Sequence, residues 1–371
     1  MEQKKSNRLH SLDALRGFDM FFIMGGAGLL GGLSQIWSNP VTDWIAIQMQ
    51  HAEWDGFQHH DIIFPLFLFI AGISFPFSLA NKLAKNETKL QIRKDIFRRG
   101  MILFLLGILY NNGLNFDFPN MRYMSVLGRI GLAWMFGALI YTNFKQQARL
   151  IWIATILVGY YLLIAFVPAP DAPAGASNFS PQGNFAGWID RILLFGTWAG
   201  KYQDPEGILS TIPAIATALL GMQAGRLIKW ETDKITPAKK ALYLLLTGIA
   251  LVIVGQLWGE LMPINKKLWS SSFVCFVGGL GFMHIALFYY VIDVLNFKKW
   301  SFFFTVIGMN SITIYLAQRI IGFTKASEFF SKGFIAITPD YLNGFVSSIF
   351  YIGVCWYFLY FLYKHKIFLK V

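Results

Sequence analysis

Residues 60–81 read HDIIFPLFLFIAGISFPFSLAN, and after Asp61 no charged residue follows until Lys82. An uncharged apolar run of about 20 residues has the length that an α-helix needs to cross the hydrocarbon core of a bilayer. Similar runs occur along the chain, of which 55% is hydrophobic and only 14% is charged. In a soluble domain roughly a quarter of the residues are charged. The sequence therefore predicts an all-α, polytopic integral membrane protein.

Ten runs of this kind predict ten transmembrane helices. They cover residues 17–36, 60–81, 97–114, 125–142, 149–167, 207–227, 241–259, 272–294, 301–320 and 343–363. No internal repeat and no second domain is visible, so residues 1–371 are expected to form a single transmembrane domain. The two cysteines, Cys275 and Cys355, both lie in predicted spans. This argues against a disulfide framework or a zinc site.

The distribution of Lys and Arg predicts the orientation of these helices. An even number of spans puts both termini on one side, and most of the 32 basic residues lie on that side. They include Lys4, Lys5 and Arg8 before the first span. By the positive-inside rule both termini are cytoplasmic. Residues 37–58 contain no Lys or Arg, so His51 is expected on the outer side. The net charge of +12 is then a signal of topology rather than of nucleic-acid binding.

The longest non-hydrophobic segment, residues 168–206, is expected on the same outer side. It is rich in Pro, Ala, Gly and Asn, and a loop of this length is usually either functional or disordered. Within it, residues 188–198 are apolar enough to form a short interfacial helix.

The first two spans are separated by the string His51-Ala-Glu-Trp-Asp-Gly-Phe-Gln-His59-His60-Asp61, which holds three of the six histidines. Ionisable side chains next to hydrocarbon are rare unless function needs them. Histidine exchanges protons near neutral pH, and a neighbouring carboxylate stabilises its charged form. A solvated interfacial histidine is the simpler interpretation of His51, and general-base catalysis is the one that its neighbours favour. Spacing alone does not exclude metal binding, but the His-x3-His pattern of a helical zinc site is absent, and no metal is expected.

Other polar strings have a structural interpretation beside the functional one. Asp13 and Arg16 share a helix face, so they form either an ion pair that anchors the first helix or a cytoplasmic mouth for an anionic ligand. Asp204 and Glu206 lie at the start of the sixth span, and capping of that helix is the simpler interpretation of both. Asn310 inside the ninth span fits a polar contact between helices.

Two more polar strings also have a structural interpretation. Lys266 and Trp269 precede the eighth span, where snorkelling lysines and an interfacial tryptophan are common. His284, inside that span, is interpreted as a histidine whose hydrogen bonds are satisfied within the bundle rather than as a catalyst.

Taken in order, these strings resemble the heparan-α-glucosaminide N-acetyltransferase family and in particular its bacterial relatives. The resemblance extends from about Arg8 to the C-terminal Lys-Ile-Phe-Leu-Lys. It is carried by Ser11-Leu-Asp13-Ala-Leu-Arg16-Gly17, His51-Ala-Glu-Trp54-Asp-Gly56, Asp61-Ile-Ile-Phe-Pro65, Val126-Leu-Gly-Arg129, Asp204-Pro-Glu-Gly-Ile-Leu209, Asn265-Lys-Lys-Leu-Trp269-Ser and Gly308-Met-Asn310-Ser. The first motif also looks like the Leu-Asp-x-x-Arg-Gly start of the wider transmembrane acyltransferases.

The resemblance implies a multi-pass enzyme of the bacterial inner membrane. It would take acetyl-CoA from the cytoplasm and deliver the acetyl group to the amine of a glucosamine-type sugar on the outer side. The family's catalytic histidine corresponds to His51, with Asp61 as the expected partner. Arg16, Arg98 and Arg99 are expected to bind the CoA phosphates, because guanidinium groups match phosphate geometry. The expected substrate-binding residues are Trp54, Asp55, Asp204, Glu206, Asn265, Lys266, Trp269 and Asn310. Asn265 or Asn310 would hold the thioester oxyanion.

This sequence departs from the lysosomal enzyme at two positions, since Met24-Gly25-Gly26 stands in place of an asparagine and Asp55 replaces another. The acceptor therefore stays open, and an O-acyltransferase acting on a cell-envelope glycan or lipid is one alternative. A secondary transporter of sugars is another, because broken helices and intramembrane polar groups are common to both classes. His51 would either deprotonate the amine or carry the acetyl group itself. Membrane lipids and a second copy of the chain in a homodimer are the expected partners.

Overall fold

The structure, a computed structural model, describes residues 9–232 and 235–369. Lys4, Lys5 and Arg8, on which the predicted orientation partly depends, lie outside the described residues. The described part is built from helices, and extended backbone pairs only in two isolated bridges, Arg122 with Gly196 and Pro168 with Asn184. The prediction of an all-α fold is therefore confirmed.

Within the described residues, seven helices are long and apolar enough to cross a membrane. They are His10–Ile36 (α1 to α3), Ile63–Ala84 (α5), Gln146–Phe166 (α8), Thr211–Lys229 (α10), Pro237–Gly259 (α11), Ser271–Val294 (α12 and the π-helical turn after it) and Asp340–Lys364 (α16). A pair bent by 58°, Lys299–Met309 and Ser311–Ile320, forms an eighth. Each overlaps one of the expected spans.

The remaining two expected spans coincide with α6 (Lys89–Asn112) and α7 (Val126–Asn143). Charged residues fill the first half of α6, from Lys89 to Arg99, so its uncharged part is too short to cross a bilayer alone. The expected number of ten spans is therefore not confirmed, and the cytoplasmic position of both termini stays a prediction.

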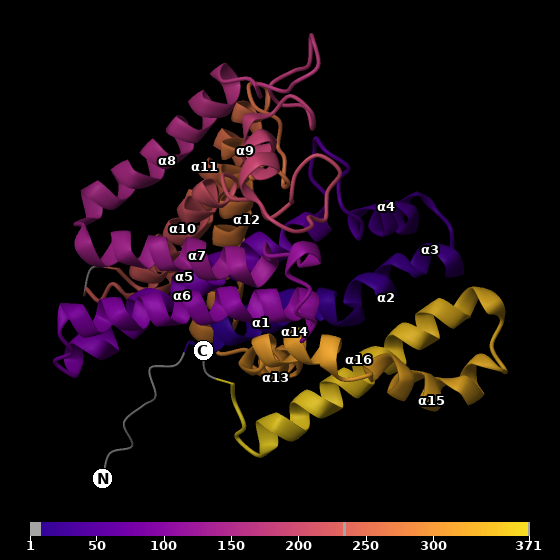
Figure 1. The fold of residues 1–371 in the computed structure, drawn as a ribbon. Helices are drawn as coiled ribbons and strands as arrows, with labels where there is room; N and C mark the ends of the chain where they lie inside the picture. The colour runs from indigo at the N-terminus through magenta and orange to yellow at the C-terminus, as the bar shows by residue number, and fades with distance from the viewer. Residues whose placement is uncertain (1–8, 233–234, 370–371) are drawn as a thin grey trace.

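The first span is broken by a kink at Met24 and Gly25. Residues Phe22–Gly26 are π-helical, and Gly25 has φ +107°, a conformation that residues with a side chain rarely adopt. The break separates α1 (His10–Phe21) from α2 (Ala27–Gly31). The short helices α3 (Leu33–Ile36) and α4 (Pro40–Gln48) then lead toward the loop that contains His51 (Figure 1).

Two glycines let α1 and α13 (Phe302–Met309) touch through their backbones. A Cβ atom on Gly17 would lie 1.7 Å from the carbonyl oxygen of Phe304, and one on Gly308 would lie 1.9 Å from that of Asp13. Such small residues allow close helix packing in membranes. The contact places the break between α13 and α14 (Ser311–Ile320) beside Arg16, whose Nη1 lies 3.4 Å from the carbonyl oxygen of Gly308.

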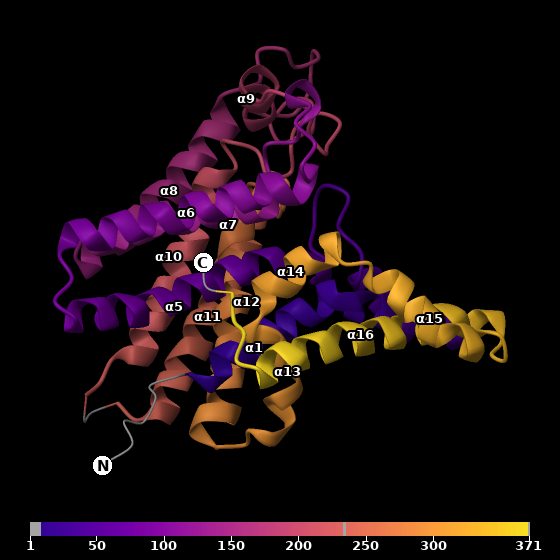
Figure 2. The same ribbon diagram turned by 60° about the horizontal axis from the view of Figure 1, so that its bottom comes forward.

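The helices α5, α7, α10 and α12 lie side by side in the centre, and α11 covers α12 (Figures 1 and 2). Their facing sides are apolar and fully buried, for example at Leu68, Ile73, Leu219 and Phe273. The hairpin of α15 (Phe323–Ile335) and α16 extends to one side of this bundle in both views. Helix α5, backed by α10, and the pair α6–α7 form walls of the main cavity.

The segment 168–206 is folded rather than extended, and α9 (Phe185–Leu193) is the short helix expected in it. The helix begins three residues earlier than expected, because the buried Asn184 caps it through a 2.6 Å hydrogen bond from the Gly187 N–H. It ends earlier because Gly196 pairs with Arg122 in an isolated bridge. Arg122, in the loop between α6 and α7, also binds Asp204 and Glu206 and so holds this part of the segment against that loop.

Candidate active site

A cavity of about 500 Å³ lies between α1, α5, α6, α7 and the break between α13 and α14. One end is lined by Arg16, Ser74 and Arg99, and the other by His51 and Lys266. Ile63 and Ser74 both line it, and α5 rises about 16 Å between them. The middle is apolar, with Met20, Phe64, Phe67, Leu103 and Ile130 among the lining residues. The cavity thus connects two polar ends through an apolar passage.

His51 and Asp61 form a hydrogen-bonded pair at the end of the cavity opposite Arg16 and Arg99. His51 Nδ1 lies 2.7 Å from Asp61 Oδ1, so Nδ1–H donates and Nε2 keeps the free lone pair. The side chain of His51 is 53% exposed, whereas that of Asp61 is 2% exposed. A buried carboxylate that fixes an accessible imidazole in one tautomer is the arrangement of a general base and its orienting partner.

Asp61 also holds the loop in which His51 stands. It ends a short 3-10 turn, His59–Asp61, just before α5. Its Oδ2 accepts hydrogen bonds from the backbone N–H groups of Ala52 and Gln58, both at 3.1 Å. Burial raises the pKa of Asp61, but the bond from His51, the nearby Lys266 and these two N–H groups outweigh it and lower the pKa below its usual value. Asp61 is therefore ionised at neutral pH.

The neighbouring histidines have a different environment. The ring of His60 lies 4.6 Å from that of His51 and lines the same cavity. Burial, followed by repulsion from His51 and Lys266, lowers the pKa of His60 to about 4. The pKa of His59 is also lowered, by burial and by His284. Both are uncharged at neutral pH, and only His51 has a carboxylate partner.

The loop from Pro263 to Ser270 closes the His51 end of the cavity from the opposite side. Lys266 Nζ lies 3.3 Å from Asp61 Oδ1. Asn265 is fully buried and structures its own loop, because its Oδ1 accepts the N–H of Leu268 at 2.8 Å. Its Nδ2 has no hydrogen-bond partner among the described residues.

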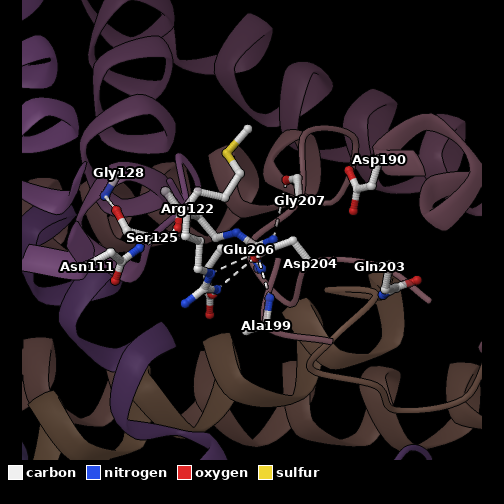
Figure 3. Close-up of polar contacts among 12 residues, drawn as sticks. Asn111, Arg122, Ser125, Gly128, Asp190, Ala199, Gln203, Asp204, Glu206 and Gly207 are labelled. Atoms are coloured by element: carbon white, nitrogen blue, oxygen red, sulfur yellow. Dashed lines mark hydrogen bonds and ion pairs between the residues drawn. The ribbon is translucent and has the colours of Figure 1, made fainter. Parts of the chain in front are cut away.

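A second charged network borders the cavity through Glu206. Arg122 donates two hydrogen bonds to Asp204, at 2.9 and 2.8 Å, and a third to Glu206 (Figure 3). Burial lowers the pKa of Arg122, but these carboxylates outweigh it and raise the pKa above its usual value. Arg122 thereby fixes Glu206 at the wall of the cavity.

Arg129 and Trp269 lie behind this wall and outside the cavity. Trp269 is fully buried, and its Nε1 donates to Thr217 at 3.1 Å. The guanidinium of Arg129 stacks 4.8 Å from its ring and donates to Ser210. The motif residue Trp269 is therefore a packing residue and not an interfacial one.

The other end of the cavity, lined by Arg16, Ser74 and Arg99, is positively charged. Arg16 Nη2 donates to Ser74 at 3.2 Å, and Nη1 lies 3.4 Å from Asp13 Oδ1, so the expected ion pair forms and also lines the cavity. Arg99 stacks 4.5 Å above Trp134, and its buried Nε has no hydrogen-bond partner within the described part. Arg98 is exposed and does not line the cavity.

The structure brings together six of the expected site residues, and Asp61 joins them through His51. Those that line the cavity are Arg16, His51, Arg99, Glu206, Lys266 and Asn310. Those that do not are Trp54, Asp55, Arg98, Asp204, Asn265 and Trp269. Trp54 instead donates to the carbonyl of Phe179 at 2.8 Å, and Asp55 is exposed. Asn310 lies toward Arg16 and donates to the carbonyl of Ile367 at 3.1 Å.

Two contributors were not expected from the sequence. Ser74 is one of two serines, with Ser78, in an otherwise apolar run, and that polarity was the available signal. For Arg122 the sequence contained no such signal, because its partners Asp204 and Glu206 are 82 and 84 residues away. His284 donates to the carbonyl of Leu280 at 2.7 Å, as expected of a histidine satisfied within the bundle. Within the described residues no group of three or more His, Cys, Asp or Glu side chains could hold a metal ion.

No family model matches the chain, but comparison with known proteins finds similar sequences. It is 25% identical to heparan-alpha-glucosaminide N-acetyltransferase of Mus musculus over 425 residues, covering 100% of this chain and 61% of that protein. It is 28% identical to the Homo sapiens protein of the same name over 370 residues, covering 84% of this chain and 53% of that protein. The chain thus spans less than two thirds of the length of these relatives. Over most of its own length it is similar to the heparan-alpha-glucosaminide N-acetyltransferases, which confirms the resemblance that its motifs carry.

Proposed function

We propose that this protein is a membrane-bound acetyltransferase. It moves the acetyl group of cytoplasmic acetyl-CoA to the amine of a glucosamine-type sugar on the outer side of a bacterial inner membrane, with both termini in the cytoplasm. One observation carries the proposal. A single cavity has arginines at one end and the His51–Asp61 pair at the other. The similarity to acetyltransferases named for a glucosaminide supports it.

The arginine end fits the charged part of the donor. CoA carries phosphates that resist transfer into hydrocarbon, so the donor has to be bound from the side on which it is made. Arg16 and Arg99 present guanidinium groups, which form charge-assisted hydrogen bonds with phosphate oxygens. The unpartnered Nε of Arg99 is one such donor. Asn310, held beside Arg16, is placed for the donor rather than for the oxyanion that the sequence suggested.

The apolar passage fits the uncharged arm of the donor. The pantetheine chain of CoA carries no charge and ends in the thioester, so it can extend along the apolar wall toward His51. The rise of about 16 Å along α5 separates the phosphate-binding end from the catalytic pair. The thioester would then lie at the outer end while the nucleotide stays on the cytoplasmic side.

At the outer end, His51 acts as a general base. Its Nε2 takes a proton from the sugar ammonium, and the free amine attacks the thioester carbonyl carbon. The C–N bond forms, the C–S bond breaks, and the sulfur leaves with the electron pair. One proton ends on the CoA sulfur and the other goes to solvent. Asp61 keeps Nδ1–H bound throughout, so the same nitrogen, Nε2, accepts and returns protons.

Glu206 is placed for the acceptor. It lines the cavity, and only its Oε2 is engaged by Arg122. The other oxygen makes no hydrogen bond among the described residues, so it can accept one from the sugar ammonium or a hydroxyl.

The decisive experiment uses inverted membrane vesicles that contain the protein, with labelled acetyl-CoA outside and glucosamine loaded inside. Label on the sugar, and its loss in His51→Ala with acetyl-CoA binding retained, supports the proposal. Full activity of His51→Ala refutes the assignment of His51. Sugar flux without acetyl-CoA consumption indicates a transporter, and label on hydroxyls only indicates an O-acyltransferase.

A further inference from the structure

Lys266 and Lys267 follow one another, but their ammonium groups have different surroundings. Lys267 donates to the backbone carbonyl of Glu53 over 2.6 Å. Lys266 Nζ lies 3.3 Å from Asp61 Oδ1, and 3.1 and 3.5 Å from Nδ1 and Nε2 of His51. Lys266 is therefore a third member of the His51–Asp61 cluster, whereas Lys267 only ties two loops together.

The backbone around Lys266 is fixed on both sides. Ile264 accepts a 3.0 Å hydrogen bond from the N–H of Gly56, so the two outer loops are joined just before Lys266. After it, the N–H of Trp269 donates to the carbonyl of Lys266 at 3.1 Å, and Trp269 is fully buried. A snorkelling lysine needs no such fixed loop. The position of the ammonium is thus built into the fold.

The charges around His51 can be compared directly. Asp61, His60 and Lys266 are in contact with it, Glu206 lines the same cavity, and His59 lies beside His60. The two other histidines are uncharged at neutral pH, and Glu206 is paired with Arg122. One anion and one cation therefore act on the imidazole at contact distance. Asp61 favours a positive charge on the ring, and Lys266 disfavours it.

We propose that Lys266 is a positioning residue whose positive charge opposes the protonation of the His51 imidazole, so that Nε2 stays available as the base. Nδ1 cannot donate to Asp61 and accept from Lys266 at once. The ammonium therefore directs a hydrogen to the Asp61 carboxylate at 3.3 Å, its contact with Nε2 is longer at 3.5 Å, and its charge acts on the whole ring. The consequence for catalysis rests on the proposed function, but the effect on the protonation of His51 does not.

The direct test measures the protonation of His51 without acetyl transfer. Diethyl pyrocarbonate modifies only the uncharged imidazole, and mass spectrometry of the peptide separates His51 from His59 and His60. In full-length protein, Lys266→Met is expected to move the midpoint of His51 modification to higher pH by about one unit, a tenfold slower reaction below the midpoint. Lys267→Met is the matched control and should keep the wild-type midpoint.

Two further variants separate the charge from the hydrogen bond and from folding. Lys266→Gln keeps an N–H donor for Asp61 without the charge and should shift the midpoint as Lys266→Met does. Lys266→Arg keeps the charge and should restore the wild-type midpoint. An unshifted midpoint in Lys266→Gln, or an equal shift in Lys267→Met, would overturn the proposal.

The pH profile of kcat/KM for acetyl transfer gives the catalytic readout. The acid limb should move to higher pH in Lys266→Gln, with rates at alkaline pH within a few-fold of wild type. A loss that is equal at every pH would mean that Lys266 has only a structural role. Wild-type protein without acetyl transfer would refute the proposed function, while the modification midpoints would still decide the role of Lys266.

Discussion

The guanidinium of Arg16 on α1 donates a hydrogen bond to the hydroxyl of Ser74 on α5 over 3.2 Å. Its other nitrogen lies 3.4 Å from the carbonyl oxygen of Gly308 on α13, so three helices fix it at the end of the cavity opposite His51. Arg99 contributes a second guanidinium to the same end. Arg16 already has Asp13 as an ionic partner at 3.4 Å, and an anionic ligand at this end would interact with both guanidinium groups.

Arg16→Gln and Arg99→Gln are therefore expected to weaken donor binding. Losing one charge-assisted hydrogen bond costs about 1.5–3 kcal/mol, which corresponds to a KM for acetyl-CoA raised about 10- to 100-fold. The kcat value should change little, because neither residue is near His51. Initial rates over a range of labelled acetyl-CoA concentrations would measure this.

Arg98→Gln is the matched control, because Arg98 precedes Arg99 but is exposed and does not line the cavity. Its KM for acetyl-CoA should stay within about twofold of wild type. An equal effect of all three substitutions would indicate a general loss of surface charge rather than a donor site.

Asp61→Asn should separate the fold of the loop that contains His51 from its chemistry. Asparagine Oδ1 can still accept the N–H groups of Ala52 and Gln58, so the loop should stay folded. Its amide can donate to His51 Nδ1 and favour the wrong tautomer, so kcat should fall by about 10²–10⁴. The KM for acetyl-CoA should be unchanged. A kcat within threefold of wild type would contradict the role of Asp61.

The sequence was sufficient for features that depend on neighbouring residues. Apolar runs located eight of the spans, and the pairing of His51 with Asp61 followed from ten residues of separation and a helix start. Both are local, because a helix and a short loop restrict where nearby side chains can lie. The similarity to a family ranked His51 above the doublet of His59 and His60, and the structure supplies the physical reason, since only His51 contacts Asp61.

Features that depend on tertiary contacts could not be predicted in the same way. Arg122 reaches two carboxylates more than 80 residues away, and Lys266 reaches His51 across 215 residues. The burial of Trp269 depends on how the eighth span packs against α10. Periodicity and composition contain no information on which distant loops meet, so interfacial and substrate-binding interpretations of these residues could not be decided.

Glu206 and Asp204 share Arg122, yet their substitution should have different effects. Glu206 lines the cavity, so Glu206→Gln should raise the KM for the amino-sugar about tenfold through the loss of one charged hydrogen bond, with the KM for acetyl-CoA unchanged. Asp204 is fully buried away from it. Asp204→Asn should therefore lower the unfolding temperature in detergent, because breaking a buried ion pair costs about 3–5 kcal/mol.

The two measurements, acceptor kinetics and thermal unfolding, should separate these variants. If Asp204→Asn also raised the KM for the acceptor while leaving the unfolding temperature unchanged, both carboxylates would belong to the acceptor site.

The buried Asp190 on α9 is expected to make the stability of the protein depend on pH. It is 2% exposed, and burial raises its pKa to about 7. A raised pKa means that the folded state retains the proton while the unfolded chain loses it near pH 4. The contribution of protonated Asp190 to the free energy of unfolding is therefore fully present below about pH 4. It is lost progressively as the pH rises to about 7, by roughly 4 kcal/mol at most.

Asp190→Asn should remove this dependence, because its amide is neutral throughout and its Oδ1 can still accept the N–H of Ile208, a 2.9 Å bond in the wild type. Unfolding temperatures in detergent between pH 4.5 and 7.5 should fall less steeply for the variant. Asp171 is the contrasting control, since its hydrogen bond to Arg191 lowers its pKa. Any stability that Asp171 adds is present above about pH 4 and lost below it. Parallel curves for Asp190→Asn and the wild type would show that Asp190 is ionised in the folded protein at neutral pH.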